Sequence, residues 1–108
     1  MGTPVMSKKL LGNEIIRVMK TIYDPEIPVD VYELGLIYDV QINDDYSVNI
    51  LMTLTTPNCP VAESLPQEVE DKVALIHDVK KASVDITFEP PWTKDMLSEE
   101  AMLELGML

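Results

Sequence analysis

The sequence predicts an α+β fold: a two-layer α/β sandwich with an α-β-β-α-β core, a small mixed three-stranded sheet and a C-terminal helical tail. Apolar residues recur at helical spacing in two segments and at every second position in three others. The chain has 108 residues, of which 46% are hydrophobic, enough for one modest core. We therefore expect a single domain over residues 1–108, with residues 1–6 as a disordered leader.

The first helix is expected to begin after Ser7, because serine is a favourable N-cap residue. It should end by Asp24, because the residue before Pro25 is disfavoured in the α conformation. The apolar stripe that would face the sheet consists of Leu11, Ile15, Val18 and Ile22.

Two strands are expected to follow as a β-hairpin around a turn at residues 43–45. The alternating apolar positions of the first strand are Leu36, Tyr38, Val40 and Ile42. Those of the second strand are Tyr46, Val48, Ile50, Met52 and Leu54. The second strand leads directly into the segment that holds the single cysteine.

A second helix should begin between Pro60 and Pro66, because proline is tolerated in the first helical turn. Its apolar face consists of Leu65, Val69, Val73 and Ile76. A third strand is predicted by the alternation of Val84, Ile86 and Phe88. Ser98 and the acidic residues after it open a short helix in the tail.

Composition excludes several classes of function. The chain carries 19 acidic and 8 basic residues, a net charge of −11, so it has no basic footprint for nucleic acid and is disfavoured at anionic membranes. It has no apolar run long enough to span a membrane and no secretion signal. A single cysteine cannot form an internal disulfide, which is typical of a cytoplasmic protein.

Cys59 lies in the segment TLTTPNCPVAESLP, between a predicted strand and a predicted helix. Pro60 suits the first helical position, so Cys59 would be the N-cap residue, with the positive end of the helix dipole at its sulfur. That setting lowers the pKa of a thiol and favours the thiolate, which binds metals. We also expect the threonines of this segment to be exposed. The alternative is that Cys59 is a small buried apolar residue of the core.

Other residues define what Cys59 could do. His77 is predicted at the far end of the second helix, so a cysteine protease or acyl transferase is disfavoured. A closed zinc site is disfavoured because it needs several cysteines or histidines. Carboxylates such as Asp24 and Glu26 could join Cys59 at an open site, if both loops share one rim of the domain. Trp92 follows two prolines and could anchor a partner or pin the tail to the core.

Three stretches, YDPEIPVDVYELGLIYDV, MTLTTPNCP and PPWTKDMLSEEAMLELGML, together resemble the SufT/PaaD-type domain of iron–sulfur cluster assembly factors. The resemblance covers residues 14–108. It implies a two-layer α/β fold and a role in maturing iron–sulfur proteins without catalytic turnover. It places the functional centre at Cys59, with the acidic turn at residues 24–26 and the loop threonines Thr53 and Thr55. The phenylacetate-pathway relatives carry an extra cysteine-bearing tail that this chain lacks, so the general assembly branch is favoured.

We therefore expect a cytoplasmic accessory factor, not an enzyme, that acts through Cys59 and through contacts with the iron–sulfur assembly machinery and apo client proteins. No cofactor should be stably bound, because a cluster normally needs about four thiolate-type ligands. A cluster could be held transiently, for example between the subunits of a homodimer. The alternatives are an interaction module with a structural Cys59 or, less favoured, a thiol redox protein.

Overall fold

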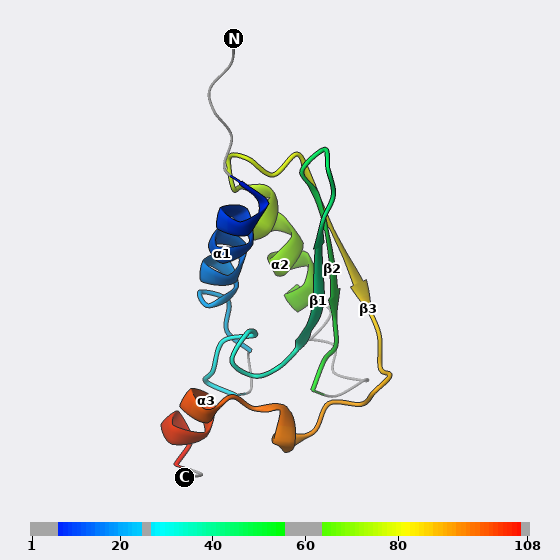
Figure 1. The fold of residues 1–108 in the computed structure, drawn as a ribbon. Helices are drawn as coiled ribbons and strands as arrows, with labels where there is room; N and C mark the ends of the chain where they lie inside the picture. The colour runs from blue at the N-terminus through cyan, green and yellow to red at the C-terminus, as the bar shows by residue number, and fades with distance from the viewer. Residues whose placement is uncertain (1–6, 25–26, 56–63, 107–108) are drawn as a thin grey trace.

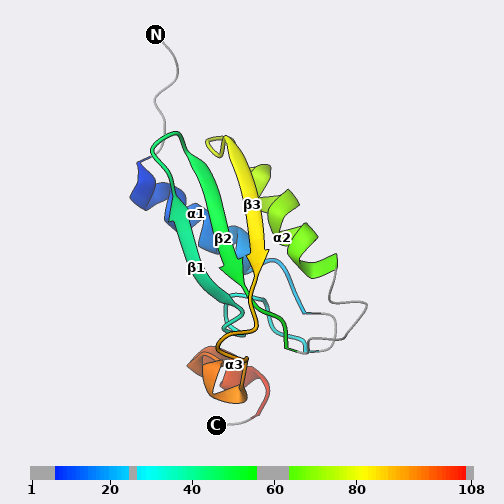
Figure 2. The ribbon, with the colours of Figure 1, turned by 90° about the vertical axis from the view of Figure 1, so that its right-hand side faces the viewer.

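The computed structural model describes residues 7–24, 27–55 and 64–106, and it has two layers (Figure 1). Helices α1 (Lys8–Met19) and α2 (Ser64–Ala74) pack on one face of a sheet made of β1 (Ile37–Ile42), β2 (Ser47–Met52) and β3 (Lys81–Ile86). The tail adds a 3-10 helix (Lys94–Met96) and α3 (Glu99–Glu104) at one end of the sheet (Figure 2). The predicted α-β-β-α-β order and helical tail are confirmed.

The sheet is mixed, with the strand order β1-β2-β3. β1 and β2 pair antiparallel as the predicted hairpin, whereas β2 and β3 pair parallel, with α2 in the connection between them. β2 is the central strand, and its side chains Val48, Ile50 and Met52 point into the core and are almost fully buried. β2 and β3 both run toward the end of the molecule where α3 lies (Figure 2).

Helix α1 begins as the sequence predicts and ends earlier than its apolar stripe. The Ser7 hydroxyl accepts a hydrogen bond from the backbone N–H of Leu10 at 3.2 Å, which caps the helix. Leu11 and Ile15 are fully buried, but Met19 rather than Val18 continues the buried face. Ile22 is also fully buried and lies beyond the helix, in the loop that follows.

The hairpin turn is held by side chains of the turn itself. The Asp45 carboxylate accepts hydrogen bonds from the backbone N–H and the hydroxyl of Ser47, at 3.0 and 2.7 Å. Tyr46 adopts a φ of 66° and belongs to the turn. The expectation that it belongs to the second strand is therefore wrong. At the other end, Leu54 also falls outside the strand.

The third strand is shorter and less buried than its apolar alternation suggests. β3 ends at Ile86, which is 38% exposed, and Phe88 lies beyond the strand and is 42% exposed. Ala82 and Val84, which pair with Val48 and Ile50, provide the inward-facing side chains. The expectation that residue 88 belongs to a strand is therefore wrong, because pairing with β2 ends where β2 itself ends.

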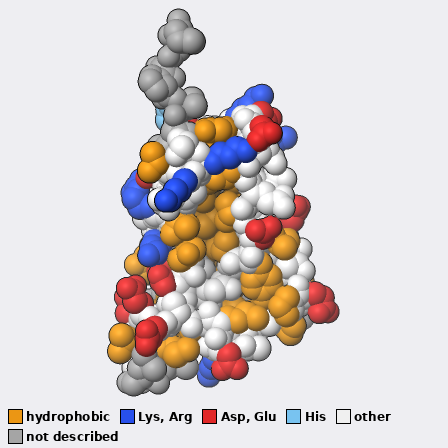
Figure 3. Space-filling view, in the orientation of Figure 1, with side chains coloured by type: hydrophobic (Ala, Val, Ile, Leu, Met, Phe, Trp, Pro, Cys, Tyr) orange, Lys and Arg blue, Asp and Glu red, His pale blue; other side chains and the backbone are white. Residues whose placement is uncertain are grey.

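The edge of the sheet at β1 borders an apolar groove. A cleft of about 340 Å³ lies between α1 and β1, and hydrophobic side chains gather along it (Figure 3). The pairing register shifts between Ile37 and Asp39, and the backbone N–H of Val40 is bonded to the Asp39 carboxylate at 3.0 Å. Bulges and charged side chains on an edge strand discourage pairing with another chain.

No helix in the described ranges is long and apolar enough to cross a membrane. The expected leader, residues 1–6, lies outside the described residues.

Candidate functional site

The predicted site residues that the structure describes lie at the end of the sheet where β2 finishes. The chain between α1 and β1 lies here and is described at residues 22–24 and 27–36; it is called the 22–36 loop below. Within the loop, Val31 N–H donates to the Ile22 carbonyl at 2.8 Å, and Leu36 N–H donates to the Val31 carbonyl at 3.2 Å. Thr53 N–H, directly after β2, donates to the Leu36 carbonyl at 2.8 Å. These bonds tie the acidic loop to the end of the central strand.

Asp24 occupies a fixed position in this loop. Its side chain is only 8% exposed, and its Oδ1 accepts a hydrogen bond from the backbone N–H of Ile27 at 3.0 Å. The backbone N–H of Asp24 donates to the Val29 carbonyl at 3.3 Å. The carboxylate is therefore held by the local turn rather than solvated, which is unusual for a loop aspartate.

Asp30 is a second buried carboxylate in the same loop, and the sequence analysis missed it. It is 9% exposed, and its Oδ2 accepts the backbone N–H groups of Tyr32 and Glu33 at 3.1 and 3.0 Å. Burial raises the pKa of Asp30, and these two donors only partly oppose the shift. An aspartate placed two and three residues before free N–H groups is the pattern that would have indicated its role.

Thr53 is fully buried, so the expectation of exposed threonines is wrong at this position. The reason is that the loop ending at Leu36 lies against it, as the bond between Thr53 N–H and the Leu36 carbonyl shows. The Thr53 hydroxyl has no hydrogen-bond partner, and within the described ranges it is the one buried side-chain polar atom in that state. Leaving a buried hydroxyl unpaired costs about 1–3 kcal/mol, so this position calls for an explanation.

Of the three other residues predicted for the site, the structure describes one. Thr55 is half-buried just after β2. Cys59, together with Glu26, lies outside the described residues, so their proximity to Asp24 stays a prediction. The described chain stops at Thr55 and resumes at Ser64, the first residue of α2. Both of these points lie at the end of the sheet that carries the 22–36 loop (Figure 1).

Trp92 pins the tail to the 22–36 loop. Its indole Nε1 donates to the Leu34 carbonyl at 2.7 Å, and its half-buried ring packs against the core. Of the two roles predicted for Trp92, the intramolecular one is observed. A contact between Trp92 and a partner protein stays a prediction.

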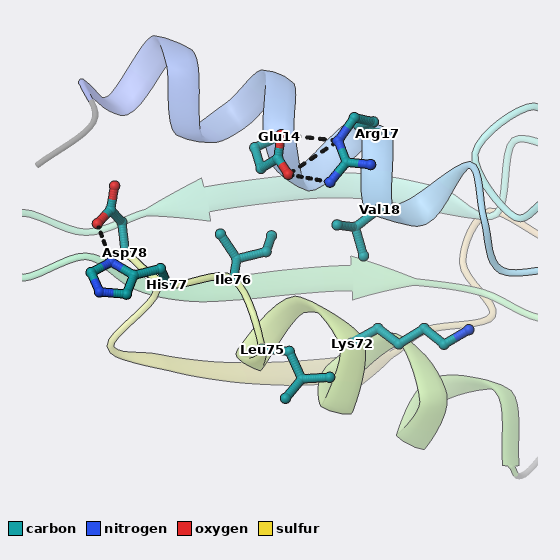
Figure 4. A pocket seen from close by; sticks show the side chains of 8 residues that line it. All are labelled: Glu14, Arg17, Val18, Lys72, Leu75, Ile76, His77 and Asp78. Atoms are coloured by element: carbon teal, nitrogen blue, oxygen red, sulfur yellow. Dashed lines mark hydrogen bonds and ion pairs between the residues drawn. The ribbon is translucent and has the colours of Figure 1, made fainter.

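His77 lies at the opposite end of α2 from Ser64, as predicted. Its side chain is 91% exposed, and Nδ1 lies 3.1 Å from Oδ1 of Asp78. It lines a cleft of about 390 Å³ between α1 and the end of α2, with the ion pair of Glu14 and Arg17 on the facing helix (Figure 4). The residues that line the cleft include neither Thr53 nor any residue of the 22–36 loop. His77 therefore supplies no base to that region.

In the described part of the chain, no three or more histidine, cysteine, aspartate or glutamate side chains are grouped so that they could hold a metal ion. A site of three or more such side chains from this chain would thus have to include Glu26, Cys59 or Glu63, which lie outside the described residues.

The sequence is similar to a family model and to named proteins of iron–sulfur cluster assembly. The sequence model described as "Iron-sulfur cluster assembly protein" matches residues 13–86. A Porphyromonas gingivalis protein named "Fe-S protein maturation auxiliary factor" is 56% identical over 105 residues, covering 95% of this chain and 100% of the relative. A Bacillus subtilis protein named "Fe-S protein maturation auxiliary factor YitW" is 38% identical, covering 93% of this chain and 98% of the relative.

A solved structure supports the same assignment. A domain of unknown function from Bacillus anthracis superposes with a TM-score of 0.85 at 30% identity, over 93% of this chain and 95% of that chain. The family model, the named relatives and the solved structure all match the greater part of this chain. The resemblance to the SufT/PaaD-type domain is therefore confirmed. The chain belongs to the iron–sulfur cluster assembly protein family.

Proposed function

We propose that this protein is an accessory factor in iron–sulfur cluster assembly, which helps to mature iron–sulfur proteins. The observation that carries the proposal is the 56% identity to a named maturation auxiliary factor over the whole length of that relative. An auxiliary factor acts by contact and transfer rather than by turnover, so its partners are the assembly machinery and apo client proteins. A lone free thiol suits this work in the reducing cytoplasm.

In this proposal the Cys59 thiolate is a transient ligand of a cluster in transit. Two observations on the residues around this segment support a role of Cys59 as a ligand. Asp24 is held in place by the backbone N–H of Ile27, in the loop whose Leu36 carbonyl accepts the N–H of Thr53 after β2. Thr53 keeps an unpaired hydroxyl at the start of the segment that leads to Cys59. Glu26 and Thr55 belong to the same proposed site as polar neighbours of the thiolate.

Stoichiometry limits how the protein can hold its cargo. A cluster normally takes about four thiolate-type ligands, and each chain has one cysteine. A cluster would therefore sit between two subunits, share ligands with a client, or take small thiols. We expect the isolated protein to be colourless and to accept, on anaerobic reconstitution, at most about one labile cluster per homodimer.

A transfer assay tests the proposal. An apo client and a cluster-loaded scaffold are mixed with or without the protein, and the iron and sulfide bound to the client are measured after gel filtration. The protein should accelerate loading, and Cys59→Ser should remove most of the acceleration while keeping the circular dichroism spectrum. Leu75→Ser, at the far end of α2, is the matched control and should behave as wild type.

Two results would count against this proposal. If Cys59→Ser accelerates loading as well as wild type, the thiol is not a ligand, and the interaction-module alternative is favoured. If neither protein accelerates loading of any client tested, the accessory role itself is contradicted.

A further inference from the structure

The C-terminal segment 87–106 lies beyond the region that the family's sequence model matches, which ends at residue 86. Two of its residues are nevertheless buried. Leu97 and Ala101 are 6% and 1% exposed and belong to the hydrophobic core. The segment crosses the end of the sheet that carries the 22–36 loop (Figure 2).

The segment contacts three consecutive residues of that loop, two through hydrogen bonds and one through a close approach of the backbone. Ser98 N–H donates to the Glu33 carbonyl at 2.8 Å, and the Trp92 indole donates to the Leu34 carbonyl at 2.7 Å. At Gly35 the backbone of Met96 is so close that a Cβ there would lie 2.3 Å from the Met96 carbonyl oxygen. Because the three contacts fall on adjacent residues, the segment fixes the main chain of the loop rather than a single side chain.

A second anchor holds the start of the same segment. The Tyr38 hydroxyl donates to the Pro90 carbonyl at 2.7 Å and lies 3.5 Å from the Met96 sulfur. Tyr38 is on β1, so the tail is attached to the sheet as well as to the loop. Two independent attachment points restrict sliding of the tail along the loop.

Residues 33–35 lie between two further contacts, one to the buried carboxylate of Asp30 and one to the site residue Thr53. Before them, the Asp30 carboxylate accepts the backbone N–H of Glu33 at 3.0 Å. After them, the Leu36 carbonyl accepts the backbone N–H of Thr53 at 2.8 Å. A shift of residues 33–35 would therefore move the acceptor of Thr53 and the donor of Asp30 together.

We infer that segment 87–106 is a clamp that positions the 22–36 loop against Thr53, with Trp92 as its main positioning residue. The inference rests on the proposed function, because it makes the tail part of the functional unit. It predicts that weakening the clamp disturbs the site while leaving the α1–α2–sheet core folded.

Amide hydrogen exchange, followed by NMR, tests the positioning role directly. Trp92→Phe keeps an aromatic ring, although a smaller one, and removes the N–H donor, and Tyr38→Phe removes the second anchor without changing the ring. A hydrogen bond of this kind contributes about a fivefold factor to a local equilibrium. We therefore expect about fivefold faster exchange at the Thr53 amide in Trp92→Phe, with the Ile50 amide of β2 unchanged.

The matched control is Val73→Ala, which removes a fully buried side chain from α2, away from the tail. It lowers global stability and should accelerate exchange at Ile50 and Thr53 by a similar factor. In the transfer assay, at equal folded fraction, Trp92→Phe should load the client more slowly than Val73→Ala. Tyr38→Phe should change Thr53 exchange and loading in the same direction as Trp92→Phe.

Unchanged Thr53 exchange in both Trp92→Phe and Tyr38→Phe would overturn the clamp. So would a loading defect that matches that of Val73→Ala at the same folded fraction. The clamp and the proposed function fail separately: if Cys59→Ser loads normally while Trp92→Phe accelerates Thr53 exchange, the thiol role is wrong and the positioning role stands.

Discussion

At one end of the sheet the hairpin turn presents Asp44 and Asp45 to solvent, and at the other end the 22–36 loop buries Asp24 and Asp30. In the exposed pair, Asp44 forms an ion pair with Lys8. The buried pair accepts hydrogen bonds from backbone N–H groups of its own loop. Both ends are acidic loops between regular elements, yet their carboxylates are in opposite surroundings.

The surroundings act on the carboxyl pKa values in opposite directions. The hydrogen bond from Lys8 lowers the pKa of Asp44, and the hydrogen bonds from Ser47 lower that of Asp45. Burial raises the pKa of Asp30. A turn that only reverses the chain can leave its acids in water, whereas the 22–36 loop holds charge in a buried frame at some cost in stability.

The largest effect should come from the contact between the loop and the tail. Gly35→Ala would place a Cβ 2.3 Å from the Met96 carbonyl oxygen, at a φ of 80°. Left-handed strain and overpacking together should lower the free energy of unfolding by about 3 kcal/mol. Urea denaturation measures the change.

Gly106→Ala is the control for Gly35→Ala. Gly106 also has a positive φ, 74°, but an added Cβ would have nothing within 4 Å. It should lose only about 1 kcal/mol, the cost of the left-handed conformation. Equal losses at the two glycines would mean that the tail does not press on the loop.

A smaller effect, of opposite sign, is expected at Thr53. Thr53→Val replaces the unpaired buried hydroxyl with a methyl group of similar shape, so the free energy of unfolding should rise by about 1 kcal/mol. Thr21→Val is the contrast, because the Thr21 hydroxyl donates to the Val18 carbonyl at 2.6 Å, and its loss should lower stability by about 0.5 kcal/mol.

The two threonine variants also separate stability from function. If Thr53 serves the proposed site, Thr53→Val should load a client more slowly although it is more stable. Destabilisation by Thr53→Val in urea would show that the hydroxyl is bonded in the folded protein and would remove it as a feature of the site.

Smaller still is the pH dependence that Asp30 contributes. Its folded-state pKa is raised above the unfolded value near 3.8, so the folded state binds the proton more tightly. The contribution of Asp30 is most favourable below the unfolded pKa and is lost as pH rises through the folded pKa. Asp30→Asn can still accept both backbone N–H groups but cannot ionise. Its melting temperature relative to wild type should therefore rise as the pH increases from about 3 to 7.

Asp44→Asn is the matched comparison at the other end of the sheet. Its pKa is lowered by Lys8, so its stabilising contribution is present above the unfolded pKa and is lost as pH falls. The melting temperature of Asp44→Asn relative to wild type should therefore fall as the pH rises from about 3 to 7. This change is opposite in sign to that of Asp30→Asn. The same sign for both variants would contradict the contrast between the two ends.

The sequence was sufficient where local chemistry decides the structure. Ser7 and Ser98 cap their helices with hydrogen bonds from Leu10 N–H and Ala101 N–H, as serine at these positions predicts. The hairpin and the parallel third strand follow from alternation and from the helix that connects them. These features depend on residues a few positions apart, which a pattern can report.

The site was less predictable because its properties come from contacts between distant segments. Thr53 is buried because Leu36 of another loop accepts its N–H, and nothing in the segment around Thr53 reports that. Asp30 resembles any loop aspartate until its burial is known. For Trp92 the sequence left two roles open, and the bond to the Leu34 carbonyl identifies one of them.

The smallest effect is expected in the cleft between α1 and the end of α2 (Figure 4), whose lining includes no residue of the 22–36 loop. Leu75 is 82% exposed there, so Leu75→Ser should change the free energy of unfolding by less than about 0.5 kcal/mol. His77→Ala should be equally mild, because the His77 ring is almost fully solvated. Client loading should be unchanged in both variants, since both side chains are exposed and neither residue belongs to the loop, the tail or the end of β2. Slower loading by folded Leu75→Ser would mean that this cleft contacts a partner, and the functional surface would then extend to both ends of the molecule.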